Sequence, residues 1–238
     1  MIKKVINQNY NLNLELLNSI DSEYFFSKKQ IDRRSKNKIP NKKIELNKVL
    51  QLENLKKDIN SIQNCKLKDN SPTMCFGNGN INSQIVIVGG APDAKDIREN
   101  KTFTGETEEL LTKMLLAINI KIKNIYTTNV VNFNPPDDRR PTSYEIKRYK
   151  IFLQKHIIII NPKILVIMGS TAMDSMTNIS QNISSERGWK EIIIGNKSFL
   201  SFITFHPSYL IRKPENKKLA WVDLKEIKKK IDELKLIV

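Results

Sequence analysis

The stretch of residues 85–105, IVIVGGAPDAKDIRENKTFTG, limits the fold of this chain more than any other. It opens with the continuous apolar run 85–88, a pattern typical of a strand that is buried on both faces of a sheet. Gly89 and Gly90 follow, and glycine lets the backbone turn sharply or approach a ligand closely. Ligands of open α/β sheets bind beyond the carboxyl ends of the strands, where this loop would lie. Alone, however, the stretch favours an ordinary surface loop between a strand and a helix.

Apolar patterns predict the other elements of the fold. Helices are predicted at residues 46–62, at 106–118, from Thr142 or Ser143 to 160, in a short segment from Thr171, and at 215–236. Strands are predicted at 85–88, 125–131 and 164–168, and a hairpin of 191–194 and 199–205 turns at Gly195 and Asn196. Because strands alternate with helices, we predict an α/β fold of three layers, αβα, with helices on both faces of a central, mainly parallel sheet.

The charge of the chain is compatible with polyanionic partners. Its 238 residues include 40 Lys and Arg against 25 Asp and Glu, a formal net charge of +15 at pH 7, and the sequence pI is about 9.7. Lys, Asn and Ile are abundant along the whole chain, as an AT-rich coding bias also produces, so charge alone indicates nucleic acid only weakly. We predict a basic, partly flexible extension at residues 1–48 and a folded domain at 49–238. The basic block 27–43 is either a solvated linker or a nonspecific phosphate-binding arm.

The cysteines and the apolar stretches indicate in which cellular compartment the protein is located. Cys65 and Cys75 are too few for a disulfide framework, and neither belongs to a CxxC pair. The first residues, MIKKVINQNYNLNLELL, have no unbroken apolar core and are a poor secretory signal. The most apolar stretch, 157–168, is interrupted by the sequence NPK and is too short to span a membrane. We therefore expect a cytoplasmic protein with reduced thiols and no membrane partner.

The ends of three of the predicted strands carry polar residues, and in this fold they converge on one edge of the sheet. They are the loop after Val88, Asn129 in TTNVVNFNPP and His206 in TFHPSYLIR. The amide of Asn129 either reads the polar edge of a base or is satisfied by neighbouring backbone. His206 precedes a proline, so a rigid turn sets its direction, and it either stabilises an oxyanion, transfers a proton or is purely structural. His156 lies within a predicted helix and is assigned no role.

The combination of these segments is more specific than any one of them. IVIVGGAPDAKDIRENKTFTG, YTTNVVNFNPPDDRRPT and TFHPSYLIRKPENKKLAW have the order and spacing found in the uracil-DNA glycosylase superfamily. Over roughly residues 55–236 the chain resembles family four of that superfamily most closely, a branch that typically carries an iron–sulfur cluster. The resemblance implies a uracil-DNA glycosylase-like fold and base excision from DNA.

The resemblance also implies roles for individual residues. Phe103 matches the aromatic residue on which an extruded uracil stacks, Asn129 the amide that binds the pyrimidine edge, and His206 the histidine that stabilises charge on the departing base. Gly89, Ala91 and Pro92 match the first loop, near the sugar and the attacking water, and Gly90 between them is a further candidate for substrate binding. The residues implied in DNA binding are Arg187, Ser208, Tyr209, Leu210 and Arg212.

Two of the implied DNA contacts have a more specific expectation. Leu210 is expected to be the wedge that fills the space left in the duplex by the departing nucleotide. Arg187, in the segment SERGW, makes either a phosphate or loop contact or a surface ion pair.

The first loop departs from the family pattern, which commonly reads GEAPG or GEGPG. Gly90 stands where the family has its acid, and Asp93 stands where it has the last glycine. Asp96 aligns with a further acidic position of the loop. We expect Asp96 or Asp93 to supply the catalytic carboxylate, which orients water and stabilises a cationic sugar.

The ligands of the family's iron–sulfur cluster are a second departure. Cys65 is retained, Ile62, Phe133 and Tyr149 occupy the other three positions, and Cys75 matches none. One thiolate cannot hold a cluster that needs four. We predict no cluster, no other cofactor and no metal site, with apolar and aromatic packing in place of the cluster.

The leading hypothesis is a monofunctional DNA glycosylase that flips uracil out of DNA and hydrolyses its N-glycosidic bond in base excision repair. No lysine occupies an obvious Schiff-base position, so strand-cleaving lyase chemistry is not expected. The alternative, favoured by Gly90, is a glycosylase-like DNA-binding protein with lost or altered base excision. A third reading is an α/β enzyme acting on small phosphorylated substrates, although the sequence contains neither a Walker-type loop nor a GxGxxG fingerprint. We expect a monomer with uracil-containing DNA as its partner.

Overall fold

The computed structural model describes residues 41–71, 73–178 and 181–238. The chain divides into two units, Met1–Pro40 and Asn41–Val238, and the description concerns the second. Residues 1–40 of the predicted basic extension, with most of the block 27–43, lie outside the described residues. Within the described ranges, no helix has the length and apolar character needed to cross a membrane.

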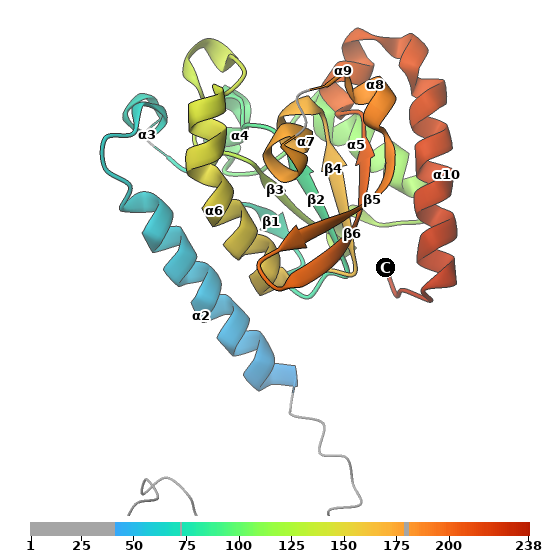
Figure 1. Cartoon of the computed structure of the whole chain (residues 1–238), viewed down its shortest axis with the longest axis horizontal. Coiled ribbons are helices and arrows are strands. Elements are labelled where there is room, and N and C mark those ends of the chain that lie inside the picture. The colour runs from blue at the N-terminus through green and yellow to red at the C-terminus, as the bar shows by residue number, and fades with distance from the viewer. Residues whose placement is uncertain (1–40, 72, 179–180) are drawn as a thin grey trace, which may run out of the picture. The chain divides into compact units, whose positions relative to one another are not determined.

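A six-stranded sheet forms the centre of the described unit (Figure 1). Its strands are β1 (Asn78–Gly79), β2 (Ile85–Gly89), β3 (Tyr126–Asn129), β4 (Ile164–Met168), β5 (Gly188–Ile194) and β6 (Lys197–Thr204). They lie in the order β1-β3-β2-β4-β6-β5. The central strands β3, β2, β4 and β6 run parallel, whereas β1 and β5 pair antiparallel at the two edges. The predicted mainly parallel sheet is confirmed.

Helices cover both faces of the sheet, which confirms the predicted three layers. They are α2 (Asn41–Asn60), α3 (Lys66–Asn70), α4 (Ala94–Glu99), α5 (Glu106–Leu116), α6 (Ser143–Ile160), α7 (Ser170–Thr177), α8 (Ile183–Glu186), α9 (Pro207–Arg212) and α10 (Lys217–Glu233). Helices α2, α6 and α7 contribute to one apolar cluster, and α5, α9 and α10 contribute to the other. Figure 1 shows α2 beside α6 on one side of the sheet and α10 on the opposite side.

Alternation along the central strands divides the core between the two faces. Val86 and Val88 of β2 pack with α2, α6 and α7, whereas Ile85 and Ile87 pack with α5 and α10. Successive residues of a strand point to opposite faces of the sheet. The unbroken apolar run of β2 therefore fills both cores, and all its residues are buried.

Two local signals in the sequence predicted structure correctly. Thr142 caps α6: its hydroxyl accepts from the Glu145 N–H at 3.2 Å, and the Glu145 carboxylate accepts from the Thr142 N–H at 2.7 Å. The hairpin of β5 and β6 turns at Gly195, whose φ is 59°, between the paired residues Ile194 and Lys197.

Several helices differ from the prediction. Helix α2 begins at Asn41, earlier than expected, and the short helices α3, α4, α8 and α9 were not predicted. Helix α9 begins at Pro207, directly after His206. Since proline has no N–H to leave unpaired, it is favourable at the first position of a helix. The turn expected after His206 is thus a helix N-terminus.

Apolar and aromatic side chains occupy the four positions that match the family's cluster ligands. Ile62, Cys65, Phe133 and Tyr149 belong to one apolar cluster. The Cys65 Sγ lies 3.2 Å from the Tyr149 hydroxyl oxygen, and the Phe133 and Tyr149 rings meet edge to face with centroids 6.5 Å apart. The predicted packing at these positions is confirmed.

We predict that Phe133→Ala lowers the free energy of unfolding by about 3–5 kcal/mol, because it leaves a cavity where a ring is now only 2% exposed. Tyr144→Ala is the matched control: the Tyr144 side chain is 72% exposed, so its loss changes the same quantity by no more than about 0.5 kcal/mol. Urea unfolding measures both, and equal losses would contradict the assigned packing.

Candidate active site

The parallel strands end at one edge of the sheet, and the candidate side chains follow from there. Strand β2 ends at Gly89, which pairs in register with Asn129 at the end of β3. Met168 at the end of β4 pairs with Thr204 at the end of β6, two residues before His206. Figure 1 shows β2 and β4 pointing to the end of the unit at which α7, α8 and α9 lie. The three polar segments singled out in the sequence meet at this edge.

Gly89 lies against two of the candidate side chains. A Cβ atom built on Gly89 would lie 2.4 Å from Asn129 Oδ1 and 2.8 Å from Phe103 Cζ. Real Cβ atoms essentially never approach other heavy atoms to less than 3.0 Å. Any other residue at position 89 would therefore displace Asn129 or Phe103.

Phe103 also contacts the third candidate side chain. Its ring stacks on the His206 imidazole, with centroids 5.2 Å apart and planes inclined by 22°. Because atoms of stacked rings touch at about 3.5–4 Å, this centroid distance means that the two rings overlap only in part. An aromatic ring, an amide and an imidazole from three separate segments are thus neighbours in the fold.

Asn129 is buried with an unpaired donor. Its side chain is 4% exposed, and within the described residues its Nδ2 has no hydrogen-bond partner. An unsatisfied buried donor costs about 1–3 kcal/mol, so such groups usually have a functional reason. The sequence left open whether the Asn129 amide is satisfied by neighbouring backbone, and for its Nδ2 it is not.

His206 is held in one tautomer by the start of α9. Its Nδ1 accepts from the Ser208 N–H at 3.2 Å and lies 2.8 Å from the Ser208 Oγ. A ring nitrogen that accepts carries no proton, so the neutral ring has its proton on Nε2. Burial lowers the pKa of His206 to about 4, and the positive charge of Arg212 contributes to the shift. At neutral pH the imidazole is therefore an uncharged donor at Nε2.

A pocket of about 530 Å³ opens beside His206. The predicted residues that line it are Gly90, Ala91, His206, Ser208, Tyr209 and Arg212. Gly89, Pro92, Phe103 and Asn129 do not line it. Phe103 and Asn129 are buried, at 3% and 4% exposure, and Phe103 stacks on His206, which lines the pocket.

Other residues of the pocket were not found from the sequence. They are Asp138, Arg139, Arg140, Pro141, Met168, Gly169, Ser170, Thr171, Gln181, Asn182, Ile183 and Phe205. Gly169, Ser170 and Thr171 are the first three residues after the parallel strand β4, so the argument from strand ends could have identified them. Arg139 is paired with Glu145, and Arg140 with Asp174.

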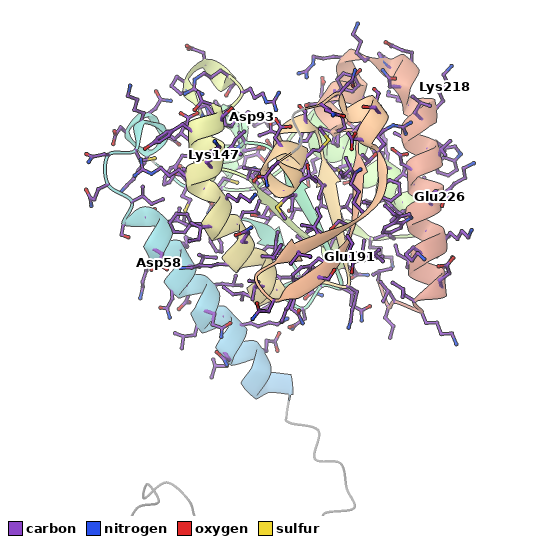
Figure 2. All side chains as sticks on the ribbon, in the orientation of Figure 1. Asp58, Asp93, Lys147, Glu191, Lys218 and Glu226 are labelled. Carbon is purple, nitrogen blue, oxygen red and sulfur yellow. The ribbon has the colours of Figure 1, made fainter. Side chains whose placement is uncertain are left out.

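The two aspartates of the first loop cap α4. Asp93 Oδ1 accepts from the N–H groups of Lys95 and Asp96, each at 2.8 Å, and an Asp96 oxygen accepts in return from the Asp93 N–H at 3.4 Å. Figure 2 shows Asp93 at the end of the unit where the strands end. Burial raises the pKa of the Asp96 carboxyl above its usual range. Neither residue lines the pocket, and the catalytic role of Asp93 and Asp96 stays a prediction.

The position of the missing acid faces α7. A Cβ atom on Gly90 would lie 3.1 Å from Thr171 Cβ, a contact tighter than nine in ten real ones. Thr171 would have to yield by a few tenths of an ångström for any side chain at position 90. A side chain at position 90 therefore requires a small shift of Thr171.

Leu210 is buried in this structure, and its role as a wedge in DNA stays a prediction. Its side chain is 1% exposed and packs in the cluster of α5 and α10. Helix α9 turns Leu210 inward, while its neighbours Tyr209 and Arg212 face the pocket. Ile211 is the apolar residue of this helix that remains partly exposed.

Arg187 has internal partners. Its Nη1 donates to Asp223 Oδ1 at 2.7 Å, and its guanidinium carbon lies 5.0 Å from the centroid of the Phe205 ring. The other oxygen of Asp223 accepts from the Thr204 hydroxyl at 2.7 Å. Of the two readings of Arg187, the structure favours the ion pair, which is mostly buried rather than on the surface. A DNA contact of Arg187 stays a prediction.

An iron–sulfur cluster does not fit this chain. Clusters of this kind are held by cysteine thiolates, and Cys65 alone stands at a ligand position, hydrogen-bonded to Tyr149 within a packed core. In the described part of the chain, no three His, Cys, Asp or Glu side chains are grouped as metal ligands.

Known proteins share the region that carries these side chains. Residues 76–225, which include Phe103, Asn129 and His206, match the family described as the uracil DNA glycosylase superfamily. The chain belongs to this superfamily. The Type-4 uracil-DNA glycosylase of Thermotoga maritima is 34% identical over 166 residues, which cover 69% of this chain and 85% of that protein.

Two archaeal relatives extend the uracil DNA glycosylase comparison. The Type-4 uracil-DNA glycosylase of Sulfurisphaera tokodaii is 31% identical, with 74% of this chain and 83% of that protein covered. The one of Archaeoglobus fulgidus is 28% identical, with 74% of this chain and 91% of that protein covered. The resemblance to family four is thereby confirmed.

We predict that the His206 ring titrates with a midpoint near pH 4 and not near its ordinary pKa of 6.5. Arg212→Ala removes a positive charge that disfavours the imidazolium, so it raises the pKa of His206. NMR titration of the ring protons measures both values. The chain has two histidines, and His206→Asn identifies the signal. A wild-type midpoint near 6.5 would contradict the burial of this ring.

Proposed function

We propose that this superfamily member is a monofunctional DNA glycosylase that hydrolyses the N-glycosidic bond of uracil in DNA. The names of its relatives, Type-4 uracil-DNA glycosylases, support the reaction. DNA is then the partner of the chain. A base in a duplex must leave the stack before its glycosidic bond can be reached, at a cost of a few kcal/mol. The protein has to repay that cost with contacts to the extruded base.

The unpaired Nδ2 of Asn129 is the observation that carries this proposal. It is a buried donor next to an aromatic ring, because Asn129 and Phe103 both lie against Gly89. A carbonyl oxygen on the edge of uracil supplies the acceptor that this donor lacks. Phe103 offers the face for stacking, since His206 overlaps its ring only in part.

His206 stabilises the departing base. Cleavage of the glycosidic bond leaves the bonding electron pair on the base, which departs as an anion, and an oxocarbenium-like sugar that water attacks. The Nε2–H of the neutral imidazole donates to an oxygen of the anion, and its direction is set by Ser208 before the reaction begins. A neutral donor suits this task because it needs no proton transfer to act.

The water is positioned without the acid that the family commonly has in the first loop. Gly90 carries no side chain, and Thr171 limits the space beside it. We therefore expect slower hydrolysis than in a glycosylase with a carboxylate at this position, since a negative charge near the sugar would stabilise the cationic transition state.

Arginines line the pocket and are candidates for holding phosphates. Arg212 lines it, as do Arg139 and Arg140, which would have to exchange their carboxylate partners Glu145 and Asp174 for phosphate. Guanidinium groups bind phosphate oxygens with two parallel hydrogen bonds, and such contacts position DNA without reading its sequence. Affinity for DNA is then expected to fall as the salt concentration rises.

We predict that Asn129→Ala lowers the single-turnover rate of uracil release by about 10²-fold or more, the scale of a lost donor to a developing charge. Asn54→Ala is the matched control, because Asn54 is exposed on α2 and lies away from the pocket. A uracil-containing oligonucleotide, treated with alkali to cleave abasic sites, reports the product. Equal rates for the two variants would contradict the role of Asn129.

The second candidate function is DNA binding without excision, which the glycine at position 90 favours. If wild-type protein binds the same oligonucleotide tightly but produces no abasic sites after prolonged incubation, the protein is a DNA-binding protein and not a glycosylase.

A further inference from the structure

The backbone at Phe103 is held in an unfavourable conformation. Its φ is 57°, in the left-handed region that bulky residues rarely adopt, and its side chain is 3% exposed. Such a conformation persists only where the surrounding contacts enforce it. The residues on the two sides of Phe103 show what enforces it here.

On the carboxyl side, Asp96 binds Thr104 twice. Asp96 Oδ1 accepts from the Thr104 N–H at 2.8 Å and from the Thr104 hydroxyl at 2.7 Å. Both side chains are buried, Asp96 at 6% and Thr104 at 4% exposure. Asp96 itself is fixed at the start of α4 by Asp93. One end of the Phe103 turn is therefore anchored to a capped helix.

On the amino side, Asn78 binds Thr102 in the same way. Asn78 Oδ1 accepts from the Thr102 N–H at 2.9 Å and from the Thr102 hydroxyl at 2.6 Å. The Thr102 hydroxyl also lies 2.6 Å from that of Thr127, which donates to the Asn78 carbonyl at 3.1 Å. Asn78 pairs with Thr127 across β1 and β3, and β3 ends at Asn129. The other end of the turn is anchored to the strand that presents the amide.

We propose that Asn78 and Asp96 are positioning residues for Phe103, which together hold its backbone in the left-handed turn. Asp96 then acts through the aromatic ring and not on the water. This role differs from that of the water-orienting acid, which was expected of Asp96 from the sequence. This proposal rests on the proposed function only because the rate of uracil release is used to measure the effect of the variants.

Alanine and isosteric variants separate positioning from acid chemistry. Asp96→Ala and Asn78→Ala remove both hydrogen bonds to a threonine, and each lowers uracil release by about 10²-fold, the scale on which a misplaced group acts. Asp96→Asn and Asn78→Asp keep an oxygen that accepts both bonds, so each loses far less. A water-orienting carboxylate at position 96 would make Asp96→Asn as damaging as Asp96→Ala, which would overturn the proposal.

A double-mutant cycle with Phe103→Ala is the sharper test. When the ring is absent, its anchor has nothing to position, so adding Asp96→Ala to Phe103→Ala lowers release by no more than about twofold. Effects that multiply, with the same loss in both backgrounds, would show that Asp96 acts independently of Phe103. Asn54→Ala, in both backgrounds, controls for an additional substitution.

Crystal structures of Asp96→Ala and Asn78→Ala give a readout without activity. The proposal expects Phe103 to leave the left-handed region in both, and an unchanged φ with the ring in place would overturn it. Absence of uracil release by wild-type protein would instead count against the proposed function, while the position of Phe103 in these variants still decides the positioning role.

Discussion

The absence of a side chain at Gly89 is the constraint on which this site depends. Asn129 and Phe103 both occupy the space that a Cβ atom would need, and Phe103 in turn supports the His206 ring. The parallel register of β2 and β3 brings Gly89 opposite Asn129, so the contact follows from the sheet itself. The three segments, which are far apart in the sequence, can meet here because the Gly89 backbone lies directly against the Asn129 and Phe103 side chains.

Enclosure by these contacts sets the charge of the groups around the site. Burial lowers the pKa of His206 and raises that of Asp96, and both shifts favour the uncharged form. The imidazole is neutral, with its donor fixed at Nε2 by Ser208. The positive charge of Arg212, which lines the same pocket, adds to the effect of burial on the pKa of His206.

The sequence was sufficient for the layers of the fold and for the residues at strand ends, because a buried strand and its loop have strong local patterns. It was insufficient for Asn78, whose strand has two residues and whose contact with Thr102 is long-range. It did not show that Leu210 is buried, since the short helix α9 was not recognised and the side chain turns into the core. The tight space between Gly90 and Thr171 depends on how β2 packs against α7, and no local sequence pattern encodes that packing.

The most direct test of this account is a crystal structure with DNA that contains a non-hydrolysable uracil nucleotide. The account predicts an extruded uracil with its ring on Phe103, its edge within hydrogen-bonding distance of Asn129 Nδ2, and one of its oxygens next to His206 Nε2. A uracil that stays stacked in the duplex, or that binds away from these three side chains, would contradict it.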